Sequence, residues 1–276
     1  MKIFAFADEA SPMIDGQITA MKRNGLRGLE VRGVDNVNVA DITLEKAWEV
    51  REKLDAAGLE VWTVGSPIGK IHVETDDFGR HLEKFCHTLR VAQILGAKNI
   101  RLFSFYIPAG QEAARYREEV IRRLRLFVEV ARDTGIDLCH ENEKGIYGDT
   151  APRCLELLEA VPELKGIFDP ANFIQCGQDT LEAWKLLRDH TKYMHIKDAL
   201  PNGRVVPAGQ GVGHLAEILA DFASFGNELT IEPHLKVFSG LKGLERAEEA
   251  GQVGQLAYPN SDAAFDAACA ALRALL

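Results

Sequence analysis

The chain of 276 residues contains no run of 18 apolar residues, so it offers no segment able to span a membrane as a helix. Its first twelve residues hold one lysine and a short apolar stretch, followed by Asp8 and Glu9. A secretory signal would be longer and would carry small residues where these acids stand. The sequence therefore predicts a protein that is neither inserted in a membrane nor secreted.

Cysteine is scarce, and an excess of basic residues is lacking. The cysteines number five, at positions 86, 139, 154, 176 and 269, and none is spaced as C-x-x-C. That pattern argues against a disulfide scaffold or a structural zinc site and favours the reducing cytoplasm. Lys and Arg number 32 against 41 Asp and Glu, for a formal net charge of −9, and no basic face suited to nucleic acid is present.

The chain also lacks a G-x-G-x-x-G loop after its first apolar run, and no linker or shift in composition divides it. The missing phosphate loop disfavours a doubly wound nucleotide-binding sheet. Short apolar runs, typical of strands, alternate instead with amphipathic stretches typical of helices. The predicted strands are 3–7, 28–32, 60–64, 99–105, 136–141, 166–169, 193–197 and 229–232. The predicted helices are 12–23, 43–57, 76–95, 111–134, 150–160, 179–190, 214–225 and 262–275.

This alternation predicts parallel strands with helices packed outside them. Eight strand–helix units of about 34 residues each suit the roughly 250 residues of a typical eight-stranded barrel. We therefore predict an α/β fold, a single (β/α)8 TIM barrel forming one domain over residues 1–276. The irregular stretch 235–260, after the last strand, is long enough to be a functional loop such as a lid.

Four neighbouring predicted strands end in a residue that can bind a metal. Active-site groups of TIM barrels come from the C-terminal ends of strands, and strands five to eight end with Glu141, Asp169, His195 and Glu232. Alone, each has an ordinary explanation, such as a turn aspartate or a core histidine. Together they occupy equivalent positions, and an unpaired buried carboxylate is costly. Three carboxylates and one imidazole suit one divalent ion, with Mn²⁺ favoured and Mg²⁺, Co²⁺ or Zn²⁺ acceptable.

Residues near these strand ends are expected to face the same site. Lys197 lies two residues beyond the histidine of strand seven and shares its face. It would either steady a developing oxyanion or form a salt bridge with Asp198 at the rim. Arg32 lies one pleat beyond Glu30, nearer the rim, where it would contact a substrate. Glu30 itself is expected to pair with Arg101 inside the barrel as a structural ion pair.

Several short stretches carry a resemblance to a known superfamily. They are GLRGLEVRG at 25–33, HEN at 140–142, FDPAN at 168–172, HIKD at 195–198, PAGQGVGHL at 207–215 and IEPH at 231–234. As a set, these motifs resemble the xylose isomerase-like barrels, the sugar isomerase and epimerase group related to tagatose/psicose 3-epimerases. The resemblance covers nearly the whole chain, although it does not single out one substrate.

The resemblance implies that Glu141, Asp169, His195 and Glu232 bind one divalent metal. It further implies that Glu141 and Glu232 form the acid/base pair, which would remove and return a proton beside a substrate carbonyl through an enediolate. We expect each glutamate to direct one oxygen to the metal and to keep the other free. Many members carry Asp-x-x-His on strand six, whereas Asn172 stands at the last of these positions here. Asn172 is therefore expected to bind the substrate in a different way.

The predicted function is thus a metal-dependent isomerase or epimerase acting on a small carbohydrate or sugar derivative. A dehydratase or lyase on a ketosugar or inosose would use the same proton abstraction and remains open. A nuclease of the apurinic endonuclease type is disfavoured, because that resemblance implies further histidine ligands that this sequence lacks. A non-catalytic sugar-binding barrel is disfavoured because all four ligands remain. The sequence leaves open whether the protein is a homo-oligomer.

Overall fold

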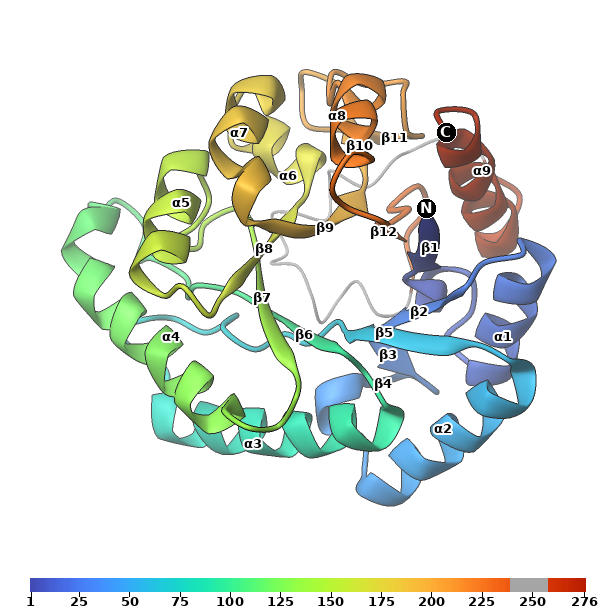
Figure 1. Cartoon of the computed structure of the whole chain (residues 1–276), viewed down its shortest axis with the longest axis horizontal. Helices are drawn as coiled ribbons and strands as arrows, with labels where there is room; N and C mark the ends of the chain where they lie inside the picture. Colours follow the sequence, from blue (N-terminus) through green and yellow to red (C-terminus); the bar gives the residue numbers. More distant parts are fainter. Residues whose placement is uncertain (239–257) are drawn as a thin grey trace.

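The strands form a closed barrel in the computed structural model, which describes residues 1–238 and 258–276. Around the barrel their order is β1-β12-β9-β8-β7-β6-β5-β2, and every neighbouring pair is parallel. Figure 1 shows the strands as an inner ring and the helices as an outer ring. The predicted single (β/α)8 TIM barrel is confirmed. The expected lid at 235–260 falls mostly on residues 239–257, outside the described residues.

The barrel strands agree with the predicted ones to within a few residues. They are β1 (Lys2–Ala5), β2 (Gly28–Val31), β5 (Glu60–Val64), β6 (Asn99–Leu102), β7 (Asp137–Glu141), β8 (Lys165–Phe168), β9 (Thr191–Ile196) and β12 (Glu228–Ile231). Two small antiparallel hairpins at the strand ends were not predicted. They are β3 (Gly33–Val34) with β4 (Val37–Asn38), and β10 (Asp198–Ala199) with β11 (Val205–Val206).

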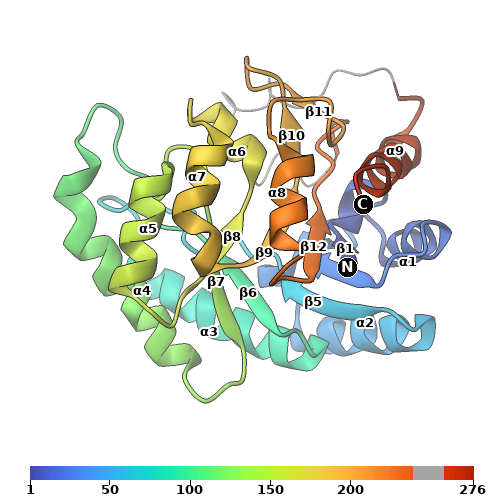
Figure 2. The ribbon, with the colours of Figure 1, turned by 45° about the horizontal axis from the view of Figure 1, so that its top comes forward.

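The helices likewise follow the amphipathic pattern. They are α1 (Ile14–Arg23), α2 (Leu44–Ala57), α3 (Phe78–Leu95), α4 (Arg117–Ala131), α5 (Ala151–Ala160), α6 (Pro170–Gln175), α7 (Thr180–Leu187), α8 (Leu215–Phe222) and α9 (Ser261–Arg273). Figure 2 shows α5, α7 and α8 standing around the strands, with α6 and the β10–β11 hairpin at one end of the barrel. Helix α6 was not predicted, because its six residues are too few to show a periodic pattern. Among the described residues, no helix is long and apolar enough to cross a membrane.

Local sequence signals set the ends of the second and third helices. The side chains of Thr43 and Asp77 accept backbone N–H groups in the first turns of α2 and α3. Both helices end at a glycine in the left-handed region, Gly58 with φ +72° and Gly96 with φ +70°. These caps turn the chain back toward β5 and β6, so the parallel strands stay in sequence order.

Alternation along the strands divides apolar side chains from the functional ones. Outward-facing strand residues join the main hydrophobic core against the helices, among them Leu29, Ile100, Leu138, Met194 and Leu229. The intervening residues point into the barrel, where Cys139, Ile167 and Tyr193 form a small separate cluster. Side chains on one face of a strand recur every two residues. The next inward-facing positions, toward the C-terminal ends of the strands, are occupied by polar residues.

The last helix closes the ring of helices against the first. Arg23 of α1 bridges Asp262 and Asp266 of α9, at 2.6 and 2.8 Å. In Figure 1 these two helices lie side by side, close to both ends of the chain. The first and last strands also pair directly, with Lys2 opposite Glu228 and Ala5 opposite Ile231. The two ends of the chain therefore complete both the sheet and its helical cover.

We predict that acid destabilises the protein partly through His81 of α3. Its Nε2 accepts the backbone N–H of Gly69 at 2.8 Å, and burial lowers the pKa of the imidazole to about 4. Below about pH 6.5 this imidazole is protonated in the unfolded chain but stays neutral in the folded chain. The free energy of unfolding therefore falls as the pH falls from 6.5 toward 4. Between about pH 7 and pH 4.5, urea unfolding should show a loss of the order of 2 kcal/mol from this residue. His81→Gln, which keeps an acceptor for Gly69, should lose correspondingly less, and an equal loss in both proteins would contradict the assignment.

Candidate metal centre

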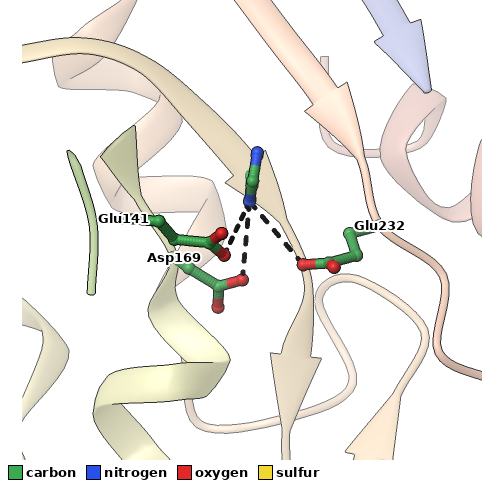
Figure 3. A group of neighbouring side chains, drawn as sticks. Glu141, Asp169 and Glu232 are labelled. Atoms are coloured by element: carbon green, nitrogen blue, oxygen red, sulfur yellow. Dashed lines mark hydrogen bonds and ion pairs between the residues drawn. The ribbon is translucent and has the colours of Figure 1, made fainter. Parts of the chain in front are cut away.

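The four residues predicted to bind a metal come together at the C-terminal mouth of the barrel. One atom from each of Glu141, Asp169, His195 and Glu232 lies within 4.8 Å of the others, and all four residues are buried. His195 Nδ1 lies 2.9 Å from Glu141 Oε1, 3.6 Å from Glu232 Oε2 and 4.0 Å from Asp169 Oδ2. Figure 3 shows the three labelled carboxylates pointing toward one another.

Strand alternation explains this convergence. Glu141 follows Cys139 by two residues, Asp169 follows Ile167, and His195 follows Tyr193. The three earlier residues of these pairs form the cluster inside the barrel. These three candidate ligands therefore occupy the next inward position of three adjacent strands. Glu232 comes directly after β12, and its backbone N–H bonds Ile196 O at 3.2 Å across to β9.

The two carboxylate oxygens of Asp169 make different contacts. Its Oδ1 accepts the backbone N–H of Asn172 at 2.9 Å and thereby caps α6. Its Oδ2 accepts no hydrogen bond of good geometry from the described residues, although Lys197 Nζ lies 2.9 Å away. A buried carboxylate oxygen is costly unless a cation binds it, and in the absence of a metal the Lys197 ammonium is that cation. Together with the imidazole and the other carboxylates, this oxygen fits the ligand set of a divalent metal.

His195 is oriented by a residue on the opposite side of its ring. Its Nε2 lies 3.1 Å from Glu30 Oε2, while Glu30 Oε1 accepts the hydroxyl of Tyr193 at 3.1 Å. This carboxylate directs Nδ1 toward the other ligands, an arrangement common for metal-binding histidines. Burial by itself would lower the pKa of His195, but Glu141 and Glu30 outweigh burial and raise that pKa to about 10. In the absence of metal, the imidazolium therefore neutralises part of the acidic cluster.

Each glutamate of the expected acid/base pair is held by a buried arginine. Arg101 Nη1 donates to Glu141 Oε2 at 3.0 Å, and Arg32 Nη1 donates to Glu232 Oε1 at 3.1 Å. The other oxygen of each glutamate faces His195. This differs from the expectation that one oxygen stays free, because a buried carboxylate needs a compensating donor on each side. An arginine-bound oxygen is also a weaker base.

One aromatic ring contacts both arginines. The guanidinium carbons of Arg32 and Arg101 lie 4.4 and 5.0 Å from the centre of the Phe6 ring. The same ring meets His195 edge-on at 5.2 Å. Phe6 comes directly after β1 and is fully buried. Its cation–π contacts with both guanidinium groups help to hold the arginines on their glutamates.

Lys197 points into the metal centre. Its Nζ lies 2.9 Å from Asp169 Oδ2 and 2.9 Å from Glu232 Oε2, the oxygens that face the cluster. Burial by itself would lower the pKa of Lys197, but the surrounding carboxylates outweigh it and raise the pKa well above its usual value. The alternative salt bridge with Asp198 does not form. Asp198 instead accepts the backbone N–H groups of Gly209, Gly211 and Gly213, each at 2.9 Å, and so folds the glycine-rich loop over the barrel end.

Asn172 and Arg32, both predicted to bind substrate, are placed among other protein groups. Asn172 Nδ2 donates to Asn142 O at 2.8 Å and lies 3.4 Å from Glu141 Oε1. Arg32 donates to Asp8 through Nε and Nη2, at 2.9 and 3.0 Å, in addition to Glu232. Both side chains therefore position site residues, and their contact with a substrate stays a prediction.

The predicted Glu30–Arg101 pair is wrong. Arg101 binds Glu141 and Gly65 O, while Glu30 binds His195, because the histidine and the metal-facing glutamate compete for these partners. Sequence reasoning also missed the acids after β1. Asp8 and Glu9 are both bound by Arg32, and Glu9 Oε2 accepts the backbone N–H of residue 234. The rule applied to strands five to eight, applied to the end of β1, would have found these two acids.

Comparison with known proteins identifies the family of this fold. Residues 18–253 match the family described as xylose isomerase-like TIM barrel. The chain belongs to that family. The resemblance drawn from the sequence motifs is thereby confirmed.

Several solved structures share the fold over nearly the whole chain. The probable 3-DHS dehydratase AsbF from Bacillus anthracis has a TM-score of 0.74 at 20% identity, covering 99% of each chain. The IOLI protein, solved with a binding zinc atom, has a TM-score of 0.73 at 15% identity, covering 100% of this chain and 98% of that one. D-psicose 3-epimerase with D-tagatose, from Clostridium cellulolyticum H10, has a TM-score of 0.72 at 15% identity, with the same coverage. At these identities the similarity shows a common fold.

One curated protein matches part of the sequence. Phosphoribosylamine–glycine ligase of Thermococcus gammatolerans is 24% identical over 135 residues, which are 48% of this chain and 29% of that protein. The chain thus matches less than a third of the length of this relative.

We predict that Asp169→Asn weakens metal binding far more than folding. Asparagine keeps an oxygen to cap α6 but turns an amide group toward the cluster. The dissociation constant for Mn²⁺, measured by calorimetry, should rise by roughly 100-fold or more, while the unfolding free energy changes by about 1 kcal/mol or less. Asp179→Asn is the matched control, because Asp179 caps α7 through the same kind of bond. Equal metal affinity in the two variants would contradict the assignment of Asp169.

Proposed function

We propose that this protein is a divalent-metal-dependent isomerase or epimerase acting on a sugar or sugar derivative. The observation that carries the proposal is the convergence of Glu141, Asp169, His195 and Glu232 at the barrel mouth, where one atom of each lies within 4.8 Å of the others. Membership in the xylose isomerase-like family and the fold shared with a psicose 3-epimerase support the same class of substrate.

The four residues would hold the metal, and Mn²⁺ suits their mixture of three carboxylates and one imidazole. A divalent ion there would polarise a substrate carbonyl and stabilise the negative charge that develops on its oxygen. Other side chains of the protein orient the residues of the site. Glu30 keeps the His195 ring turned toward the cluster, and the two buried arginines fix the orientation of Glu141 and Glu232.

Proton transfer is assigned to Glu141 and Glu232. One carboxylate takes the proton from the carbon beside the carbonyl, and the C–H electron pair moves into a carbon–carbon double bond while the carbonyl oxygen gains the charge. Return of a proton to the opposite face of that carbon gives the epimer, and return to the neighbouring carbon gives the aldose–ketose isomer. Because Arg101 and Arg32 occupy their outer oxygens, the cluster-facing oxygens are the more basic ones.

A dehydratase is the second candidate, and the position of Lys197 favours it. Its ammonium group is buried beside Asp169 and Glu232 and would give a proton to a departing hydroxyl group once the neighbouring carbon has lost its own. Water would then leave, and the double bond would remain in the product. Similarity to a probable 3-DHS dehydratase agrees with this candidate.

Solvent exchange tests the shared step of both reactions. The metal-loaded protein is incubated in deuterated water with ketoses, aldoses, ketose phosphates, 3-keto sugars and inososes. We expect deuterium to enter one substrate at a carbon beside its carbonyl, with either an isomer or a dehydrated product. Glu141→Gln and Glu232→Gln should each slow this exchange by about 10²–10⁴-fold, and the double variant little more than either alone.

Two controls separate the roles of these glutamates. Glu228→Gln alters a carboxylate at the opposite end of β12, where it pairs with Lys2, and should leave the exchange rate unchanged. Excess metal should restore a variant that has lost only a ligand but should not restore one that has lost its base. Full rescue of both Gln variants by metal would contradict the two-glutamate assignment and leave Lys197 as the next candidate.

A further inference from the structure

A cavity of about 530 Å³ lies beside the metal centre without containing any of its four ligands. The β3–β4 hairpin forms one side, and the loop between β5 and α3 forms the other. Its volume falls within the range of small-molecule sites in proteins. Neither the predicted ligands nor the proton-transfer pair accounts for this space.

The cavity and the metal centre share the Arg32 side chain. Arg32 lines the cavity together with Asp8, which it binds at 2.9 Å. The same guanidinium reaches Glu232 Oε1 at 3.1 Å. One guanidinium group therefore separates the cavity from a metal ligand. A molecule large enough to extend past Arg32 from the metal centre would place a part that does not react in this cavity.

Three cations and two carboxylates line the cavity, and each cation is paired with a carboxylate, in the case of Lys70 with one outside the lining. Arg32 pairs with Asp8, Lys84 pairs with Asp41 at 2.7 Å, and Lys70 pairs with Glu143 at 2.9 Å. A site for a phosphate or carboxylate would direct cations at the ligand rather than pair each of them with a carboxylate of the protein. The lining instead mixes donors and acceptors of both signs, a pattern suited to hydroxyl groups, which donate and accept at once.

Apolar side chains complete the lining. Val37, Pro67 and Ile71 border the cavity, and Val37, at the edge of the hairpin, is 43% exposed. Asn36 and Asn38 place amide groups next to Val37. Alternating amides and aliphatic surface match a sugar ring, which has polar edges and apolar C–H faces.

We propose that this cavity binds a second, uncharged sugar ring of the substrate, so that the protein acts on a glycoside of two rings rather than on a free monosaccharide. The inference rests on the proposed function, because it assumes that the reacting ring lies at the metal centre. It assigns the β3–β4 hairpin to substrate specificity.

Binding of unreactive glycosides tests the proposal independently of catalysis. Methyl glycosides of one and of two rings, α- and β-linked, have no free carbonyl, and their affinities for the metal-loaded protein are measured by calorimetry. We expect at least one two-ring glycoside to bind about tenfold more tightly than its one-ring counterpart. Val37→Trp should fill the cavity and abolish this preference, with the melting temperature checking that the variant is folded.

Leu186→Trp is the matched control, because Leu186 is also 43% exposed but lies on α7, away from the cavity. This variant should keep the preference for two rings. Equal affinity for one-ring and two-ring glycosides, a preference that survives Val37→Trp, or tighter binding of a hexose phosphate would each overturn the proposal. A protein that binds two-ring glycosides but exchanges no deuterium with any carbonyl sugar would instead contradict the proposed function alone.

Discussion

The architecture of the barrel mouth depends on the cost of burying several carboxylates in one place. Glu141, Asp169 and Glu232 lie within reach of a single imidazole, and all are screened from solvent. Removing one cation from such a group leaves an uncompensated charge, at a cost of about 3–5 kcal/mol. Four cations among the described residues accordingly bind these carboxylates: Arg101 and Arg32 bind the outer oxygens, and His195 and Lys197 bind the inner ones.

The two arginines neutralise carboxylate charge permanently, whereas His195 and Lys197 neutralise it in a way that a bound metal could replace. The arginines both contact the Phe6 ring and stay charged at all relevant pH values. A histidine proton and a lysine ammonium can move, and they lie against the very oxygens that a metal would bind. A divalent ion entering the cluster would thus take over charge that His195 and Lys197 neutralise in its absence. Metal binding would release the proton of His195, because a metal-bound imidazole is neutral, and would leave Lys197 available to orient a substrate or to supply a proton.

The sequence predicted most of the fold and the four central residues, because both follow from regular spacing. Strand alternation fixes which face Glu141 or His195 occupies, and parallel strands bring all their ends to one rim. Residue spacing could not predict which side chains pair with one another inside the barrel. The partner of Arg101 is Glu141 rather than Glu30 because strand tilt and side-chain length decide which carboxylate lies within 3.0 Å. Helix α6 was not predicted, because its start is marked by an aspartate cap and not by an amphipathic pattern.

The central claim is that these four side chains form one metal site. Anomalous diffraction from crystals grown with Mn²⁺ tests it most directly. The account predicts one strong peak among Glu141 Oε1, Asp169 Oδ2, His195 Nδ1 and Glu232 Oε2, with the ammonium of Lys197 moved away from Asp169 and Glu232, which it now contacts. A peak at the neighbouring group of Glu9, Glu232 and His234, or none in the barrel mouth, would contradict the account.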